Sequence, residues 1–170
     1  MLPRFTWSDE FTEEHNLRLM HWAPSVFGGQ DVDLDWAPKD HHLFVWAENE
    51  LAGHVGILKR EVTVGDEPVL LGGIGGVVTR PEWQGQGFAT AAMRKAVDYL
   101  RDELKVEFGF IFVQAHRVSF YERMRWRVAA NVVYIEQRGG RLLSPVSSMY
   151  IPCADRSWPA GDVNLKGNAW

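Results

Sequence analysis

Two glycines, Gly85 and Gly87, are the residues of this sequence whose type and spacing point most directly to chemistry. They lie in "VVTRPEWQGQGFATAAMRKAV", residues 77–97, where a β-branched run, a short loop and a helix-forming segment predict a strand–loop–helix junction. The first N–H groups of a helix have no partner inside it, and the helix dipole is positive there. Glycine lets a ligand approach the backbone closely, and no acidic residue follows until Asp98. The pattern indicates an anion site suited to phosphate, and an ordinary glycine-rich turn is the alternative.

Other phosphate-binding motifs fit this segment less well. It contains no Gly-Lys-Ser/Thr, which excludes the nucleotide-triphosphate loop. A dinucleotide fingerprint requires a third glycine where Thr90 stands, and it requires parallel neighbouring strands. The strands expected before this helix form a meander instead.

The composition restricts the class of protein. The chain has 170 residues, of which 46% are hydrophobic and 24% charged, as in a globular domain. Its net charge of −4 argues against broad nucleic-acid binding. We expect no signal peptide and no membrane span, because the longest apolar run, Val69–Val78, is too short. Cys153 is the only cysteine, which favours a reducing cytoplasm. His41 and His42 would point to opposite faces of a strand, so no metal site is expected.

Hydrophobic periodicity predicts an alternation of helices and strands. Ser8 is expected to cap a first helix that ends before Pro24. Further helices are predicted over Phe88–Leu104 and His116–Arg125. The predicted strands are Leu43–Ala47, Leu51–Val64, Val69–Thr79, Val106–Val113, Val128–Gln137 and Leu142–Ile151, the last two paired as a hairpin.

This order predicts a single α/β domain over residues 1–152. Its central sheet should be mixed, mostly antiparallel, of about six or seven strands, and flanked by helices. Residues 153–170 read as an irregular C-terminal tail.

Two motifs resemble those of the GCN5-related N-acetyltransferase (GNAT) superfamily. "QGQGFA", 84–89, resembles its Gln/Arg-x-x-Gly-x-Gly/Ala signature, and "SFYERMRW", 119–126, resembles its second motif, although Arg125 stands where the family has glycine. The resemblance implies the GNAT fold, with acetyl-CoA as acyl donor. Its pyrophosphate would lie on Gln84, Gly85, Gln86, Gly87, Phe88, Ala89 and Thr90.

The strand before the loop carries four glycines in "LLGGIGGVV". Glycine weakens a strand interior by roughly 0.5–1 kcal/mol relative to alanine, so these positions require a reason. The resemblance implies that this strand diverges from the next one and that the pantetheine arm of acetyl-CoA bonds to Val77, Val78 and Thr79. A glycine-rich crossing beneath a bulky aromatic side chain is the alternative.

The resemblance also assigns roles at the thioester. Tyr121 stands where the family keeps the acid that protonates the leaving thiolate, although its ring could instead simply pack on the sheet. A backbone N–H freed at a bulge near Val77 or Val78 would polarise the acyl carbonyl. Gly75 stands where the aminoglycoside enzymes of the family have a glutamate base, which leaves His54 as a candidate base or as a structural histidine.

A narrower resemblance connects the chain with aminoglycoside 2′-N-acetyltransferases. It rests on "RPEWQGQG", "FYERMRW", "FGGQDVDLDW" and the tail "AGDV…W". Acidic residues also outnumber basic ones before residue 41, which suits a cationic acceptor, although a solvated acidic loop has the same composition. The candidate substrate-binding residues are Gln30, Asp31, Asp33, Asp35, Trp36, Asp162 and Trp170.

The expected function is an acetyl-CoA-dependent N-acetyltransferase. The acceptor would be a primary amine of a small cationic molecule, an aminoglycoside-type amino sugar, attacking directly within a ternary complex. Such an enzyme would confer antibiotic resistance. Acetylation of a peptide or protein amine and CoA binding without turnover are the alternatives. The resemblance also allows a homodimer.

Overall fold

The structure, a computed structural model, describes residues 1–20 and 34–170. Its helical elements are α1 (Glu13–Met20), η1 (Pro81–Trp83), α3 (Phe88–Asp102), η2 (Ala115–Arg117) and α4 (Val118–Glu122). Its strands are β1 (Arg4–Ser8), β2 (His41–Ala47), β3 (Glu50–Val64), β4 (Glu67–Thr79), β5 (Phe108–Val113), β6 (Arg127–Val128), β7 (Val133–Gln137), β8 (Gly140–Leu143), β9 (Ser147–Pro152) and β10 (Val163–Asn164).

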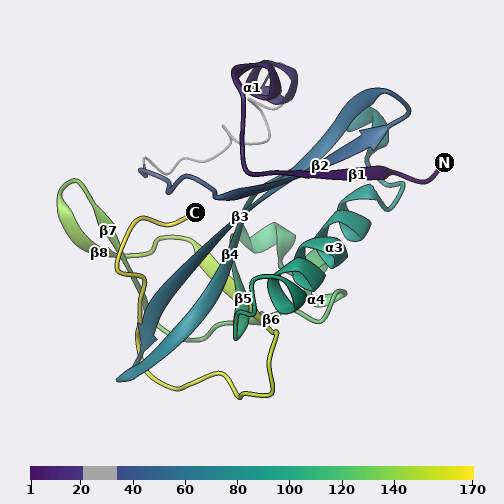
Figure 1. Ribbon diagram of the computed structural model, residues 1–170. Coiled ribbons are helices and arrows are strands. Elements are labelled where there is room, and N and C mark those ends of the chain that lie inside the picture. The colour runs from purple at the N-terminus through teal and green to yellow at the C-terminus, as the bar shows by residue number, and fades with distance from the viewer. Residues whose placement is uncertain (21–33) are drawn as a thin grey trace.

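One strongly twisted sheet organises the fold, with the long β3–β4 hairpin at its centre (Figure 1). The strand order is β6-β9-β5-β4-β3-β10-β7-β8, and β2 joins β1 to β3. Among the strand pairs of the described residues, only β4–β5 and β10–β7 are parallel. The expected single α/β domain with a mixed, mostly antiparallel sheet is confirmed, although the ten-stranded sheet is larger than predicted.

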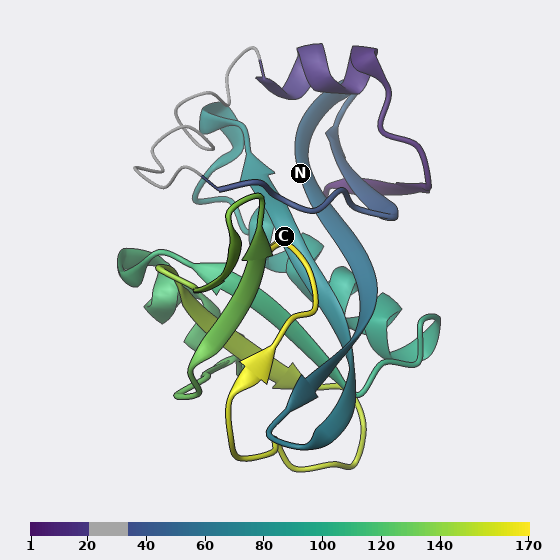
Figure 2. The same ribbon diagram turned by 90° about the vertical axis from the view of Figure 1, so that its left-hand side faces the viewer.

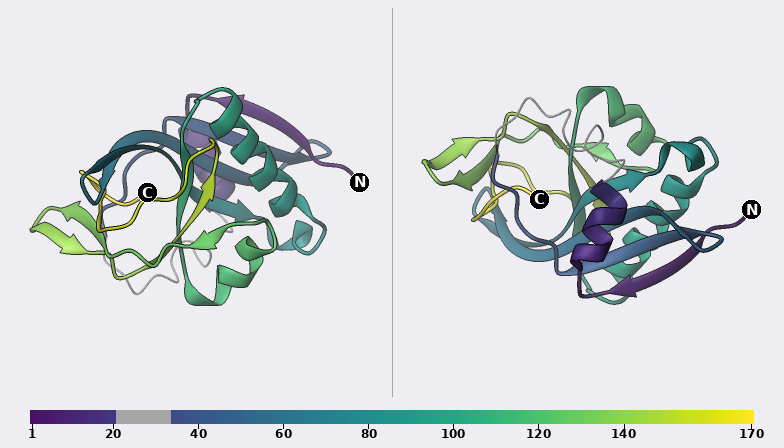
Figure 3. Two further views of the ribbon diagram at one scale, coloured as in Figure 1. Left: turned by 90° about the horizontal axis from the view of Figure 1, so that it is seen from below. Right: turned by 90° about the horizontal axis from the view of Figure 1, so that it is seen from above.

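Helices α1 and α3 cover opposite faces of this sheet (Figures 2 and 3). Successive side chains of a strand point to opposite faces, and β2 shows the consequence. Its Leu43 and Val45 join the main core beneath α3, whereas Phe44 packs with Leu19 of α1. Helices α1 and α3 therefore pack on different faces of the same strands.

The first predicted helix begins later than expected. Residues 4–8 form edge strand β1, with Ser8 opposite His42, because β2 offers them a pairing partner that is distant in sequence. Thr12 rather than Ser8 caps α1, and its Oγ1 accepts a hydrogen bond from the His15 N–H at 3.2 Å. This is the usual satisfaction of a free N–H at a helix start.

The predicted hairpin of residues 128–151 is shorter than expected. Only β7 and β8 pair, with Gln137 opposite Gly140. Pro145 then interrupts the chain because proline has no N–H to donate to a sheet ladder. The segment that follows becomes β9, which pairs antiparallel with β5 and not with β7.

The C-terminal tail is mostly without regular structure but joins the sheet. Its strand β10 pairs with β3 and β7. Leu165 and Trp170 are buried in a second core, which contains Phe108 and Phe110 of β5. The boundary placed at residue 152 stays a prediction. None of the helices in the described ranges is long and apolar enough to span a membrane.

Candidate active site

The N-terminus of α3 presents free backbone donors to solvent. Gly85 and Gly87 have φ values of 74° and 84°, in the left-handed region that favours glycine. Gly87 is the N-cap, no side chain caps the helix, and its first turn has no acidic residue. Within the described ranges, the N–H groups of residues 88–90 have no acceptor. A β-carbon at Gly85 or Gly87 would meet no protein atom within 4 Å. The loop is thus an open cradle whose donors suit a diphosphate.

Side chains of the loop stabilise its conformation without occupying these donors. Gln84 Nε2 donates to the Thr79 carbonyl at 2.9 Å, and Gln86 Nε2 donates to the Glu82 carbonyl at 2.8 Å. The rings of Trp83 and Phe88 stack with centroids 5.5 Å apart. The loop is therefore preorganised, and both glutamines hold its own backbone in this structure.

Strands β4 and β5 diverge next to this loop. Their parallel pairing ends at Ile74 and Ile111, although both strands continue. Along 77–79, β4 is paired with β3 only through Val78 and Thr79. The opposite edge of this segment has no strand partner in the described part of the chain, so its backbone groups can bond an extended ligand arm.

Two of the four strand glycines make room for large apolar side chains. A β-carbon at Gly72 would lie 2.2 Å from Leu100 Cδ2 of α3, and one at Gly73 would lie 2.3 Å from Trp170 Cε2. At these two positions glycine is explained by large side chains that cross the strand, which is the alternative given in the sequence analysis.

A β-bulge lies where β4 leaves β5. His54 is opposite Val78 and Gly56 is opposite Gly75, so two residues of β4 stand against one of β3. Gly76 in the bulge has a φ of 59°. The bulge interrupts the hydrogen-bond ladder between β3 and β4 and changes the orientation of the Gly76–Val77 peptide group.

Lys39 and Trp170 fill the space over Gly75. A β-carbon there would lie 2.8 Å from Lys39 Cε and 2.8 Å from the backbone carbonyl carbon of Trp170, so the site has no room for a glutamate side chain. Lys39 Nζ donates to the Ala37 carbonyl at 2.8 Å. Burial, and secondly the charge of Arg60, lower the pKa of Lys39 to about 8.

Tyr121 of α4 lies in the core beneath α3, only 7% exposed. Its ring packs edge-on against Trp126 with centroids 6.2 Å apart. Burial raises the pKa of the Tyr121 hydroxyl to about 12, an effect partly opposed by Arg117. The hydroxyl is therefore protonated at neutral pH, as an acid must be, and its catalytic role stays a prediction.

His54 is buried beside the bulge. Its Nδ1 lies 2.8 Å from the Gly76 carbonyl oxygen, and its Nε2 lies 2.9 Å from His42 Nδ1. Burial lowers the pKa of His54 to about 3. A ring with both nitrogens engaged and so low a pKa accepts a proton poorly, so this environment does not favour the base role, which stays a prediction.

Three of the predicted substrate-binding residues, Gln30, Asp31 and Asp33, lie outside the described residues. Asp35 forms an ion pair with Arg138 at 3.0 Å, so its carboxylate already has a partner. The half-buried Trp36 packs against Phe112.

The two predicted substrate-binding residues of the C-terminal tail, Asp162 and Trp170, lie apart. Asp162 is at the β3–β4 turn, where its carbonyl accepts the Gly65 N–H, whereas the bulge is at the other end of this hairpin. The structure therefore does not bring Asp162 to the bulge. Trp170 does lie there, but its ring is 3% exposed and donates Nε1–H to the Phe110 carbonyl at 3.0 Å. That ring is part of the core.

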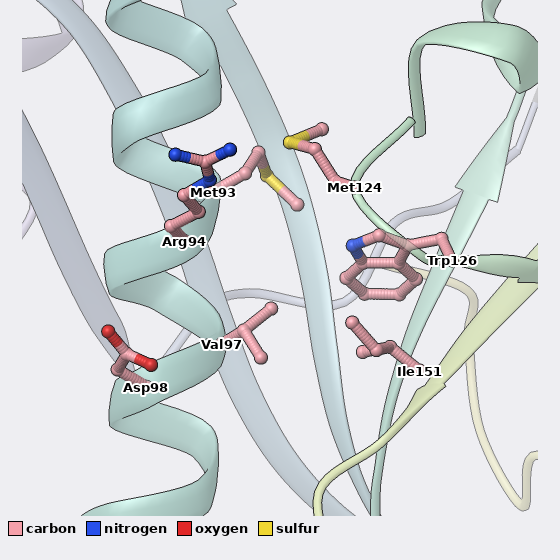
Figure 4. A pocket seen from close by; sticks show the side chains of 7 residues that line it. All are labelled: Met93, Arg94, Val97, Asp98, Met124, Trp126 and Ile151. Carbon is pink, nitrogen blue, oxygen red and sulfur yellow. The ribbon is translucent and has the colours of Figure 1, made fainter. Parts of the chain in front are cut away.

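A separate pocket of about 100 Å³ opens between α3 and the segment after α4 (Figure 4). Its volume is below the roughly 300–1,000 Å³ of usual ligand sites, and the glycine loop does not line it. We do not assign it to the cofactor. Its lining residues are Met93, Arg94, Val97, Asp98, Met124, Trp126 and Ile151.

Sequence reasoning missed Lys39 and the link from His42 to His54. The available signal was the glycine pattern, since Gly56 and Gly75 face each other across the β3–β4 register and leave space for the Lys39 stem. That register is set by pairing between distant residues, so the lysine could not be placed from its neighbours in the chain.

Comparison with known proteins agrees with this geometry. A family model described as an acetyltransferase (GNAT) domain matches residues 19–129. An aminoglycoside 2′-N-acetyltransferase from Mycolicibacterium fortuitum is 32% identical over 95 residues, which is 55% of this chain and 47% of that protein. The chain thus spans about half the length of this curated relative.

Solved structures show the same fold. Escherichia coli ElaA superposes with a TM-score of 0.61 at 18% identity, covering 88% of this chain and 99% of that chain. An acyl-CoA N-acyltransferase from Pseudomonas aeruginosa has a TM-score of 0.58 at 23% identity and the same coverage, 88% and 99%. At these identities the likeness shows the fold alone.

Proposed function

Because the chain belongs to the GNAT acetyltransferase family, we propose that it transfers an acetyl group from acetyl-CoA to a primary amine of a small acceptor. The observation that carries the proposal is the free N-terminus of α3, with two left-handed glycines, beside the point where β4 and β5 diverge. Loop donors would bind the diphosphate, and the free edge of β4 at 77–79 would bond the pantetheine arm.

The reaction is a direct attack in a ternary complex. The neutral amine forms a C–N bond to the acetyl carbon, and the C–S bond then breaks. A backbone N–H at the bulge stabilises the oxyanion of the intermediate. The amine loses one proton to solvent water, the departing thiolate receives one from Tyr121, and solvent then returns a proton to the Tyr121 oxygen, so that the products are the amide and the free thiol of CoA. The buried, protonated hydroxyl of Tyr121 supports this role.

We further propose an aminoglycoside-type amino sugar as acceptor. The support is the 32% identity to the Mycolicibacterium fortuitum aminoglycoside 2′-N-acetyltransferase, together with the acidic composition of the segment before β2. A cationic acceptor is attracted by excess negative charge near its site.

Thiol release from acetyl-CoA across aminoglycosides, polyamines and peptides tests the function and the acceptor together. Release that requires an aminoglycoside supports the full proposal. Release with peptides only would contradict the amino-sugar acceptor and retain acetyl transfer. Stabilisation by CoA without release for any amine would reject turnover and leave a CoA-binding module.

Tyr121→Phe should lower turnover by about a hundredfold while leaving the Kd for CoA nearly unchanged, since general acid catalysis contributes on this order. The measurements are thiol release under saturating substrates and calorimetric titration with CoA. Tyr150→Phe is the matched control, because Tyr150 stacks on Trp158 in the other core. Equal turnover in Tyr121→Phe and the wild-type protein would reject the acid role.

A further inference from the structure

The bulge in β4 is bound by a histidine side chain of the neighbouring strand. His54 is 5% exposed, and its Nδ1 lies 2.8 Å from the carbonyl oxygen of Gly76. Gly76 has no opposite residue in the β3–β4 register, because pairing passes from Gly75 to Val78. The imidazole therefore takes the place of the backbone partner that the bulge removes.

The protonation of the two histidines follows from this contact. A carbonyl oxygen only accepts hydrogen bonds, so Nδ1 of His54 carries the proton and donates it. In a neutral ring Nε2 then has a lone pair, which accepts the Nδ1–H of His42 at 2.9 Å. His42 is 6% exposed, and the same burial that keeps His54 neutral also lowers the pKa of His42. His42 thus donates to His54, and His54 donates to the Gly76 carbonyl in the bulge.

The planarity of the peptide bond transmits this contact to an N–H group. The carbonyl of Gly76 and the N–H of Val77 belong to one peptide unit, which is trans because the described chain contains no cis bond. In a trans unit the two groups point in opposite directions. Anchoring the Gly76 oxygen on the His54 ring therefore directs the Val77 N–H away from that ring. The other edge of β4 is the one from which β5 has diverged.

We infer that His54 is a positioning residue for acetyl transfer, which holds the Gly76–Val77 peptide so that the Val77 N–H meets the acyl carbonyl of acetyl-CoA. This inference rests on the proposed function. The contact does more than orient the group, because a hydrogen bond to a carbonyl strengthens the N–H of the same peptide as a donor. Close approach of the ring also explains the glycine, since a β-carbon at Gly76 would lie 3.3 Å from His54 Cε1 and Nδ1.

Isotope-edited infrared spectra of bound [1-¹³C]acetyl-CoA test the inference without an acceptor. In the wild-type protein the carbonyl band should lie below its position in free acetyl-CoA, because a hydrogen bond weakens the C=O bond. In His54→Leu the band should return towards the free position. His54→Asn keeps an amide N–H near the place of Nδ1, so most of the shift should be restored.

Two further measurements distinguish positioning from a general structural role. Hydrolysis of acetyl-CoA, measured as thiol release in the absence of an amine, should be slowed about tenfold or more in His54→Leu. This loss of rate should be smaller than the loss expected when an oxyanion donor is deleted outright. The Kd for CoA, which has no acyl group, should stay the same. His15→Leu is the control, because His15 stacks on Phe44 in the same cluster and has no bond to β4. Its carbonyl band should match that of the wild-type protein.

The outcomes separate this inference from the proposed function. If His54→Leu does not fold, His54→Gln replaces it, because its amide reaches the place of Nε2 and leaves Gly76 without a donor. An identical carbonyl band in the wild-type protein and in this variant would overturn the role of His54 alone. Failure of the wild-type protein to bind acetyl-CoA would overturn the proposed function itself.

Discussion

Gly87→Glu should weaken CoA binding by roughly a hundredfold or more, which corresponds to losing two charge-assisted hydrogen bonds of about 1.5 kcal/mol each. Gly87 caps α3 with a φ of 84°, and the space around its α-carbon is open. The new side chain would therefore fit against the protein but extend into the space in front of the free N–H groups. Its carboxylate would compete with the diphosphate for these donors and repel it. Titration calorimetry with CoA measures the effect.

A matched substitution at Gly140 controls for the backbone strain that Gly87→Glu introduces. Gly140 also has a positive φ, 111°, and a β-carbon there would also meet no atom within 4 Å. It lies at the β7–β8 turn and not at the loop before α3. Gly140→Glu adds the same charge and also places a side chain at a positive φ, so it should bind CoA like the wild-type protein. If Gly87→Glu also bound CoA normally, the diphosphate site could not be at this helix terminus.

The loop and its helix were predictable because their signals are local. Left-handed glycines, a missing acidic residue and the apolar face of α3 can all be read within about twenty residues. Met93 and Leu100 are buried on that face, as the spacing predicts. Strand β3 also begins and ends within one residue of its predicted limits, since turn residues flank it on both sides.

Elements that depend on distant partners were predicted less well. Strand β1 exists because β2 pairs with it, and β9 is separated from its expected hairpin because β5 offers an edge. Sequence periodicity describes which face of a strand is apolar but not which strand lies beside it. The same limit concealed the bond between His54 and Gly76, which depends on an irregularity in the β3–β4 register.

Lys39→Met should raise the free energy of unfolding at pH 7 by about 2 kcal/mol. The pKa of Lys39 is lowered from 10.5 to about 8, mainly by burial. A shift of this size means that the charged Lys39 destabilises the folded state by about 3 kcal/mol, a cost that methionine removes. About 1 kcal/mol is subtracted from this gain because methionine cannot form the hydrogen bond to the Ala37 carbonyl. Methionine keeps an unbranched stem over Gly56 and Gly75. Denaturant unfolding at several pH values measures the difference.

The pH dependence of this gain identifies its source. Between about pH 8 and 10.5 the unfolded chain binds more protons at this position than the folded one, so wild-type stability rises with pH and the advantage of Lys39→Met shrinks. Below pH 8 the advantage should be complete. Lys59→Met is the control, because the exposed Lys59 also donates to a carbonyl, that of Leu104, at 2.8 Å, and should give no such gain. Equal destabilisation by both substitutions would show that the fold accommodates the Lys39 ammonium without penalty.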